Sequence, residues 1–131
     1  MAMTLQITTD TLADVYRRVR RGVALLDQKV PNWRRTMRKH QDQYNFADGD
    51  FCVLGTLEHF NGRLHTLRKR KAESVWSTQD RMTRAQYRLG IDHSSHFGFC
   101  WRTGHQDIEG PLLAELWRQE FLQDPPSLER R

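Results

Sequence analysis

The feature that most constrains the fold is an apolar stripe near the start of the chain. Apolar side chains recur there at three- and four-residue steps, namely Leu12, Val15, Tyr16, Val19, Val23, Leu26 and Val30. This period places them on one face of an α-helix, so the pattern predicts an amphipathic helix over residues 12–30. Asp10 or Thr11 is the expected N-cap. Pro31 is expected to end the helix, because the residue before a proline disfavours the α conformation.

Four further segments have helical patterns. Residues 31–40 predict a short helix in which Trp33 and Met37 share a face. Residues 78–90 predict another, which ends at a glycine. The segments 51–61 and 111–122 each repeat large apolar side chains at helical spacing, and we expect Pro111 in the first turn of the latter.

A glycine interrupts the predicted helix 51–61. Gly55 lies in its middle, and a mid-helix glycine often marks the close approach of another backbone. We expect the neighbour to be the helix at 12–30. Asp48 or Asp50 is the expected N-cap of this helix.

These elements predict a mostly α fold. We expect a single small domain over residues 1–124, with three to four packed helices, followed by a flexible tail at 125–131. The helices at 12–30, 51–61 and 111–122 should share the core. The alternation of Phe97, Phe99 and Trp101 predicts a short extended segment near residues 95–102.

Cysteine content and hydropathy indicate the cellular setting. Two cysteines, Cys52 and Cys100, do not suggest a disulfide framework, which favours a reducing compartment. The first residues lack a basic region followed by an apolar block, so we expect no secretory signal. No stretch approaches the roughly 18 apolar residues of a membrane span. We therefore expect a cytoplasmic protein without a membrane partner.

Positive charge is concentrated in the first part of the chain. Residues 1–102 contain 18 Lys/Arg and 10 Asp/Glu, whereas residues 103–131 contain 3 and 6. Clustered arginines are typical of nucleic-acid or acidic-protein binding, and a solvated basic surface is the alternative. The candidate binding residues are Arg17, Arg18, Arg20, Arg21, Arg34, Arg35, Arg38, Lys39, Arg68, Lys69, Arg70 and Lys71. Such binding would neutralise phosphates and weaken with salt.

Two groups of residues could have chemical roles. The metal candidates are His93, His96, Cys100 and His105, but their spacing matches no known structural zinc pattern, and a histidine-bearing loop with one buried cysteine is the alternative. Cys52 and His59 would lie about 10 Å apart along a helix, too far for direct contact. No catalytic motif is present, so we predict a non-enzymatic protein without a cofactor.

Four stretches together resemble a known group of proteins. They are "GVALLDQKVPNW", "DFCVLGTLEHFNGRL", "HFGFCW" and "LLAELWRQEF", and they are similar to small uncharacterised proteins of actinobacteriophages and actinobacterial prophages. The resemblance covers most of the chain except residues 63–90. It implies a phage or prophage origin, a location in the bacterial host cytoplasm and an accessory role through binding a host or phage macromolecule. It carries over no catalytic residues, and the oligomeric state stays open.

Overall fold

A computed structural model of the chain describes residues 9–61, 64, 66–67 and 81–123. The α-helices in these ranges are α1 (Thr9–Lys29), α2 (Trp33–Lys39), α3 (Val53–Phe60), α5 (Arg81–Leu89) and α6 (Gln106–Leu122). Two 3-10 helices, η1 (Gln41–Gln43) and η3 (Ser94–Phe97), lie in the connections. The prediction of a single, mostly α domain is confirmed. The predicted tail at 125–131 lies outside the described residues.

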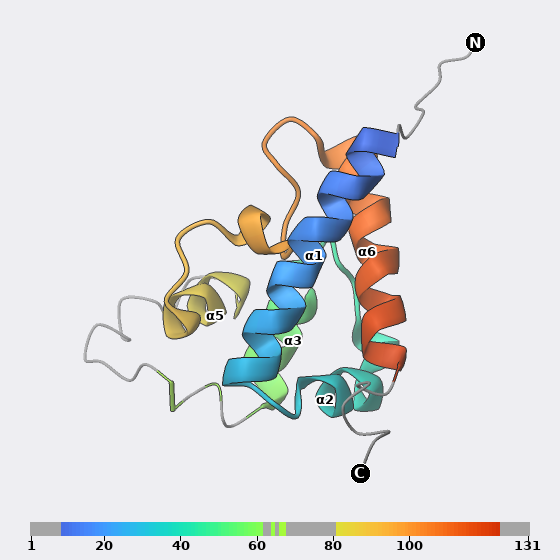
Figure 1. Cartoon of the computed structure of the whole chain (residues 1–131). Coiled ribbons are helices and arrows are strands. Elements are labelled where there is room, and N and C mark those ends of the chain that lie inside the picture. The colour runs from blue at the N-terminus through green and yellow to red at the C-terminus, as the bar shows by residue number, and fades with distance from the viewer. Residues whose placement is uncertain (1–8, 62–63, 65, 68–80, 124–131) are drawn as a thin grey trace.

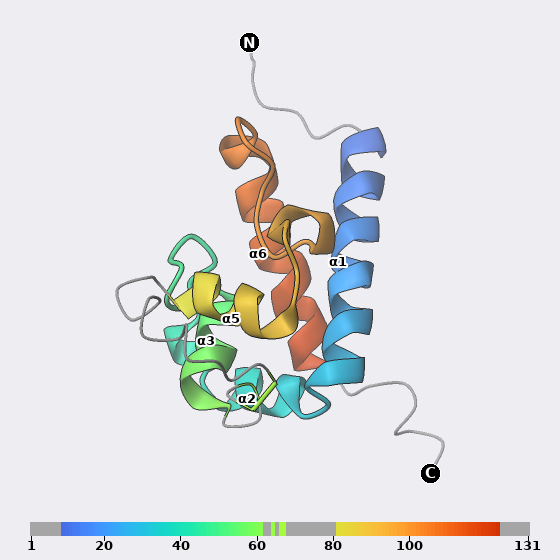
Figure 2. The same cartoon turned by 90° about the vertical axis from the view of Figure 1, so that its left-hand side faces the viewer.

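The helices form two neighbouring groups. α1 and α6 lie side by side and run in the same direction, and α2 lies across their carboxyl ends (Figure 1). α3 and α5 pack against each other, as the turned view shows (Figure 2). η3 contacts α1 on the way from α5 to α6. None of the described helices is both long and apolar enough to cross a membrane.

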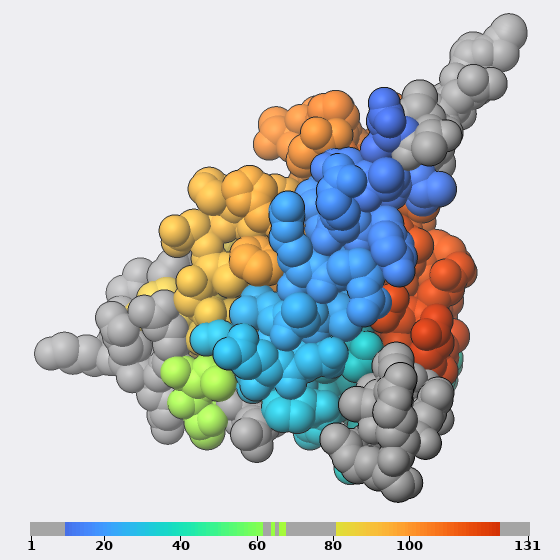
Figure 3. Space-filling view, in the orientation of Figure 1, coloured from blue at the N-terminus to red at the C-terminus, as the bar shows by residue number. Residues whose placement is uncertain are grey.

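α1 supplies one wall of the core along most of its length. Its buried residues are Val15, Val19, Val23 and Leu26, with Val30 just after its end. The prediction was wrong for Leu12 and Tyr16, which are 44% and 48% exposed. Both belong to the amino-terminal part of α1, four residues apart and therefore on the same side of the helix. α1 occupies the centre of the face shown in Figure 3.

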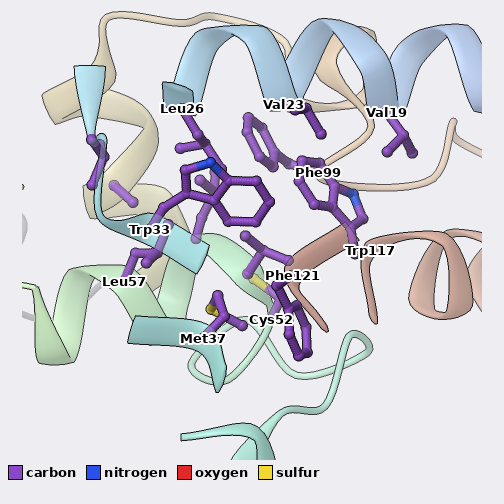
Figure 4. Packing of buried hydrophobic residues seen from close by; sticks show 14 of the residues in the cluster. Val19, Val23, Leu26, Trp33, Met37, Cys52, Leu57, Phe99, Trp117 and Phe121 are labelled. Carbon is purple, nitrogen blue, oxygen red and sulfur yellow. The ribbon is translucent and has the colours of Figure 1, made fainter. Parts of the chain in front are cut away.

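Aromatic rings fill the space between α1, α2 and α6 (Figure 4). The Trp117 ring stacks on Phe99 at a centroid distance of 5.2 Å and meets Trp33 edge-on at 5.6 Å. Its indole Nε1 donates a hydrogen bond of 2.6 Å to the Gly98 carbonyl. A Cβ at Gly22 would lie less than 3.0 Å from the Trp117 ring. Glycine at this position therefore lets α1 approach the ring.

The segment at 95–102 differs from the prediction. Residues 94–97 form η3, and no strand is assigned among the residues that the structure describes. Gly98 follows with φ 73°, in the left-handed region. Its backbone turns the chain against α1, where a Cβ would lie 2.8 Å from the Val19 backbone. The aromatic alternation therefore reflects side chains around a turn rather than the two faces of a strand.

The start of α3 also differs from the prediction. The N-cap is Cys52, neither Asp48 nor Asp50, and its Sγ accepts a hydrogen bond of 3.4 Å from the Gly55 N–H. The close approach at Gly55 is confirmed, but the neighbour was wrong. A Cβ there would collide with the backbone of Gly49 and Asp50, in the turn before α3, and not with α1.

The two longest helices begin earlier than predicted. α1 starts at Thr9, before both expected caps. α6 starts at Gln106, so Pro111 is its sixth residue instead of part of its first turn. The residues before Pro111 continue the helix because Glu109 and Gly110 are buried against the rest of the domain. Tertiary packing thus overrides the tendency of proline to mark a helix start.

Candidate functional site

The first arginine cluster, on α1, is partly buried. Arg18 is 4% exposed, and its guanidinium donates 3.1 Å hydrogen bonds to Asp14 and to the Ser95 carbonyl. Its Nη2 lies 2.9 Å from the Glu109 carboxylate on α6. Arg21 reaches the His96 carbonyl at 3.4 Å. These arginines connect α1 to η3 and α6, so they stabilise the fold.

Glu109 is a fully buried carboxylate at the junction of α1, α6 and the loop before α6. It accepts hydrogen bonds from the Arg102 backbone N–H at 2.9 Å and from Arg102 Nε at 2.7 Å, besides its ion pair with Arg18. Burial alone would raise the pKa of Glu109, but the Arg102 and Arg18 donors outweigh it and hold the pKa below its ordinary value. The group is therefore a charged structural anchor.

The second arginine cluster, on α2, caps the end of α6. Arg34 Nε donates to the Glu120 carbonyl at 3.3 Å. Arg38 Nη1 lies 3.4 Å from the Phe121 carbonyl and 3.2 Å from the Gln123 carbonyl. The last carbonyls of a helix lack intrahelical donors and favour nearby cations. Arg34 and Arg38 supply both the hydrogen-bond donors and the positive charge.

Two further ion pairs bind arginines of these clusters to carboxylates. Arg34 also pairs with Asp27 at 2.7 Å, and Arg20 pairs with Glu120 at the same distance. Two acidic residues of the segment 103–131, Glu109 and Glu120, are thus partners of the basic clusters inside one domain. The uneven distribution of charge along the sequence was the observation that could have indicated this pairing.

The predicted binding surface is consequently divided. Arg18, Arg20, Arg34 and Arg38 bind other parts of the domain. Arg17 is 64% exposed and lies 3.6 Å from Asp14, and Arg35 and Lys39 are exposed on α2. The run of Arg68, Lys69, Arg70 and Lys71 lies outside the described residues. Of the described members of the predicted cationic surface, only some are left exposed for a partner.

The histidine and cysteine candidates do not form a ligand set. His93 and His96 approach with ring centroids 5.0 Å apart, but His105 is the exposed N-cap of α6, and Cys100 is half-buried elsewhere in the loop. Within residues 9–61, 64, 66–67 and 81–123, no three His, Cys, Asp or Glu residues converge in a way that could hold a metal ion.

Cys52 and His59 occupy opposite ends of α3. Cys52 is buried as the N-cap, whereas His59 is exposed and packs against Phe60, with ring centroids 4.3 Å apart. Phe60 also stacks on His40, with ring centroids 3.5 Å apart. Burial, Lys39 and His59 lower the pKa of His40, which favours the neutral ring in this stack. The predicted separation of Cys52 and His59 is confirmed.

A surface hollow of about 360 Å³ lies beside the first turns of α6. The residues that shape it are Phe46, Trp101, Asp107, Gly110, Pro111 and Ala114. The Phe46 and Trp101 rings are 6.2 Å apart and tilted by 56°. Trp101 lies across Gly110, where a Cβ would be 3.5 Å from the indole. No sequence pattern indicated this hollow, because Phe46 and Trp101 in its walls are 55 positions apart.

Comparisons of the chain with known protein families, curated proteins and solved structures found no match.

A second hollow, of about 430 Å³, lies at the ends of α1 and α5. It is lined by Lys29, Leu67, Arg88, Leu89 and Gly90. Of its two cations, Arg88 is engaged, since its Nε lies 2.9 Å from both carboxylate oxygens of buried Glu58, whereas Lys29 is exposed at the end of α1. The hollow at Phe46 and Trp101 presents apolar and aromatic surface instead, which is more typical of a recognition site.

Proposed function

We propose that this protein is a small, non-enzymatic accessory protein of a phage or prophage that acts by binding another protein. The observation that carries the proposal is the hollow walled by Phe46 and Trp101. Tryptophan and other aromatic residues are enriched at protein interfaces and dominate their binding energy when they form pockets. The phage origin rests on the sequence resemblance.

The state of the reactive side chains supports binding rather than catalysis. Cys52 Sγ is occupied at the start of α3. The Tyr44 hydroxyl donates a hydrogen bond of 2.8 Å to the Ala114 carbonyl, and burial raises its pKa far above the ordinary value. Catalysis by a nucleophile needs an activating base within hydrogen-bond reach. These two groups have structural partners instead.

Nucleic-acid binding is the second candidate. Arg35 and Lys39 lie four residues apart on α2 and are both exposed, and the chain has a net charge of +5. A mobility-shift assay with DNA and RNA tests it. Binding through phosphate contacts should weaken steeply between low and high salt, and Arg35→Gln with Lys39→Gln should reduce it. The absence of a shift at low salt would exclude this candidate.

The protein-binding proposal is tested by filling the hollow. Ala114→Gln places a longer side chain at its wall, and Ala24→Gln is the matched control on the exposed side of α1. Each purified variant is used to capture proteins from an actinobacterial lysate, with circular dichroism confirming the fold. We expect proteins retained by the native chain and by Ala24→Gln to be lost with Ala114→Gln. Equal retention by all three would contradict a role for the hollow.

A further inference from the structure

We propose that the hollow at Phe46 and Trp101 binds the side chain of a lysine in a basic segment of the partner protein. The inference rests on the proposed function and names the chemistry of the partner. It follows from three features of the described residues: an exposed carboxylate at the hollow, a backbone carbonyl that lacks its helical donor, and aromatic walls.

The carboxylate is that of Asp107. It is exposed in the first turn of α6 and is the one charged side chain among the residues that line the hollow in the described part of the chain. No Lys or Arg of the described ranges forms an ion pair with it. The nearby Arg102 is held by buried Glu109 at 2.7 Å, so it does not compete for Asp107. A cation from another molecule has access to this charge.

The backbone carbonyl also belongs to Asp107. In a helix this oxygen accepts a hydrogen bond from the N–H four residues later. That residue is Pro111, which has no N–H. Asp107 therefore offers two acceptors, its carbonyl and its carboxylate, beside one hollow. An ammonium group carries three donors and no acceptor, so its chemistry is complementary to this pair.

The walls suit the remainder of a lysine side chain. Pro111, Ala114 and Phe46 provide apolar surface for the aliphatic stem, which long cationic side chains bury while the charged head stays near polar groups. The rings of Phe46 and Trp101 add an attraction for a cation within about 6 Å of a ring face. The volume, about 360 Å³, lies at the lower end of ligand pockets.

The charge of the hollow contrasts with that of the whole chain. The protein has a net charge of +5 and would repel a basic segment at most of its surface. A lysine that reaches Asp107 finds the opposite sign in a local apolar setting. Proline in a helix interior also breaks a rule of helix stability, and such departures are expected at functional sites.

The test uses two small probes of the same length, n-butylammonium and n-butanol. Each is titrated into the full-length protein, and binding is followed by the NMR signals of the Trp101 indole N–H and the Gly110 amide. The indole signal is assigned with Trp101→Phe. We expect n-butylammonium to shift both signals in a saturable way and n-butanol to act at least about tenfold more weakly, the factor expected for a charged hydrogen bond.

Two variants test the acceptors. Asp107→Asn should weaken n-butylammonium binding about tenfold, and Pro111→Ala should weaken it as well because its N–H occupies the Asp107 carbonyl. The exposed Asp92→Asn is the matched control and should bind like the native chain.

The outcomes separate the two proposals. Equal binding of n-butanol and n-butylammonium would overturn the lysine inference and leave the hollow as an apolar protein-binding site. Unchanged binding in Asp107→Asn would overturn it in the same way. If neither probe shifts the two signals, the lysine inference fails, whereas protein binding through the hollow is decided by the capture experiment with Ala114→Gln. Selective binding of the ammonium that Asp107→Asn weakens would support both.

Discussion

The two halves of α6 are held in different ways. In the second half, Trp117 and Phe121 are buried, and Arg34 and Arg38 satisfy the last carbonyls. In the first half, one buried carboxylate, Glu109, holds the helix against α1, while the opposite side opens onto the hollow. Both halves contribute contacts that stabilise the domain, and the open half also has acceptors and aromatic surface left for a partner.

The sequence alone does not show which arginines and carboxylates are already paired inside the domain. The arginines of α1 and α2 resemble a binding surface in the sequence, yet several are occupied by the carboxyl end of the same chain. Asp107 is an exposed carboxylate in a chain of net positive charge, and no sequence pattern indicated it as a binding residue. The group that is free for a partner depends on which charges the fold has already paired.

The largest effect on stability should come from replacing Glu109, which holds the first half of α6 against α1. Glu109→Ala leaves Arg18 and the Arg102 N–H without their buried partner. We expect a loss of about 3–5 kcal/mol in the free energy of unfolding, as for one partner removed from a buried ion pair. Urea denaturation measures it. The exposed Glu115→Ala is the control and should change stability by less than about 0.5 kcal/mol. Equal effects of both substitutions would show that Glu109 is not the anchor.

The same anchor predicts a pH dependence. The pKa of Glu109 is lowered in the folded protein, so its contribution to stability is complete above the ordinary pKa of 4.5 and is lost as the pH falls through the lower, folded value. Stability should therefore decrease below about pH 4.5 more steeply in the native chain than in Glu109→Gln. Urea titrations of both between pH 7 and pH 3 measure the difference. Parallel curves would contradict the assigned charge state.

Alanine substitutions at two helical glycines test how closely each half of α6 is packed. Gly22 on α1 faces Trp117 of the closed half, and Gly110 belongs to the open half. At Gly22 a Cβ would collide with Trp117, so Gly22→Ala should lower stability by about 1–3 kcal/mol. At Gly110 a Cβ would make an ordinary contact with Trp101, so Gly110→Ala should raise stability by about 0.5–1 kcal/mol. Thermal or urea denaturation distinguishes the signs. A similar gain at both positions would mean that α1 and α6 are less closely packed than described.

The cap of the closed half has a smaller expected effect. Arg38→Met keeps the aliphatic stem but removes the hydrogen bonds to the Phe121 and Gln123 carbonyls. We expect a loss of about 1 kcal/mol, typical for a cation at a helix carboxyl end. The control is Arg35→Met, one turn away and exposed, with an expected change below about 0.5 kcal/mol. If both variants lose the same amount, the loss is not due to the cap.

The open half also allows a stabilising change. Pro111→Ala restores the N–H for the Asp107 carbonyl, and one recovered hydrogen bond contributes about 1 kcal/mol. We expect stability to rise by about this amount while n-butylammonium binding falls. A stabilised variant with unchanged binding would argue that the proline has no role at the hollow.

Local sequence patterns were sufficient to locate the five α-helices of the described residues, though not all of their starts. The apolar periods predicted α1, α2, α3 and α6, and Gly90 predicted the end of α5, because both depend on neighbours a few residues away. The separation of Cys52 from His59 followed from helix geometry in the same way. The aromatic alternation at 95–102 led to the wrong prediction of an extended segment. The left-handed turn at Gly98 depends instead on how closely α1 packs there.

The tertiary structure alone decided the use of the charges and the location of the candidate site. Arg18 meets Glu109 across 91 positions of the chain, and Phe46 meets Trp101 across 55. A periodic pattern contains no information about such distant pairs, because they form only when whole helices pack. The sequence by itself indicated where the α-helices lie, but not where α1 and α6 begin. Packing determined which cations are bound within the domain and left Asp107, at the hollow, exposed to solvent.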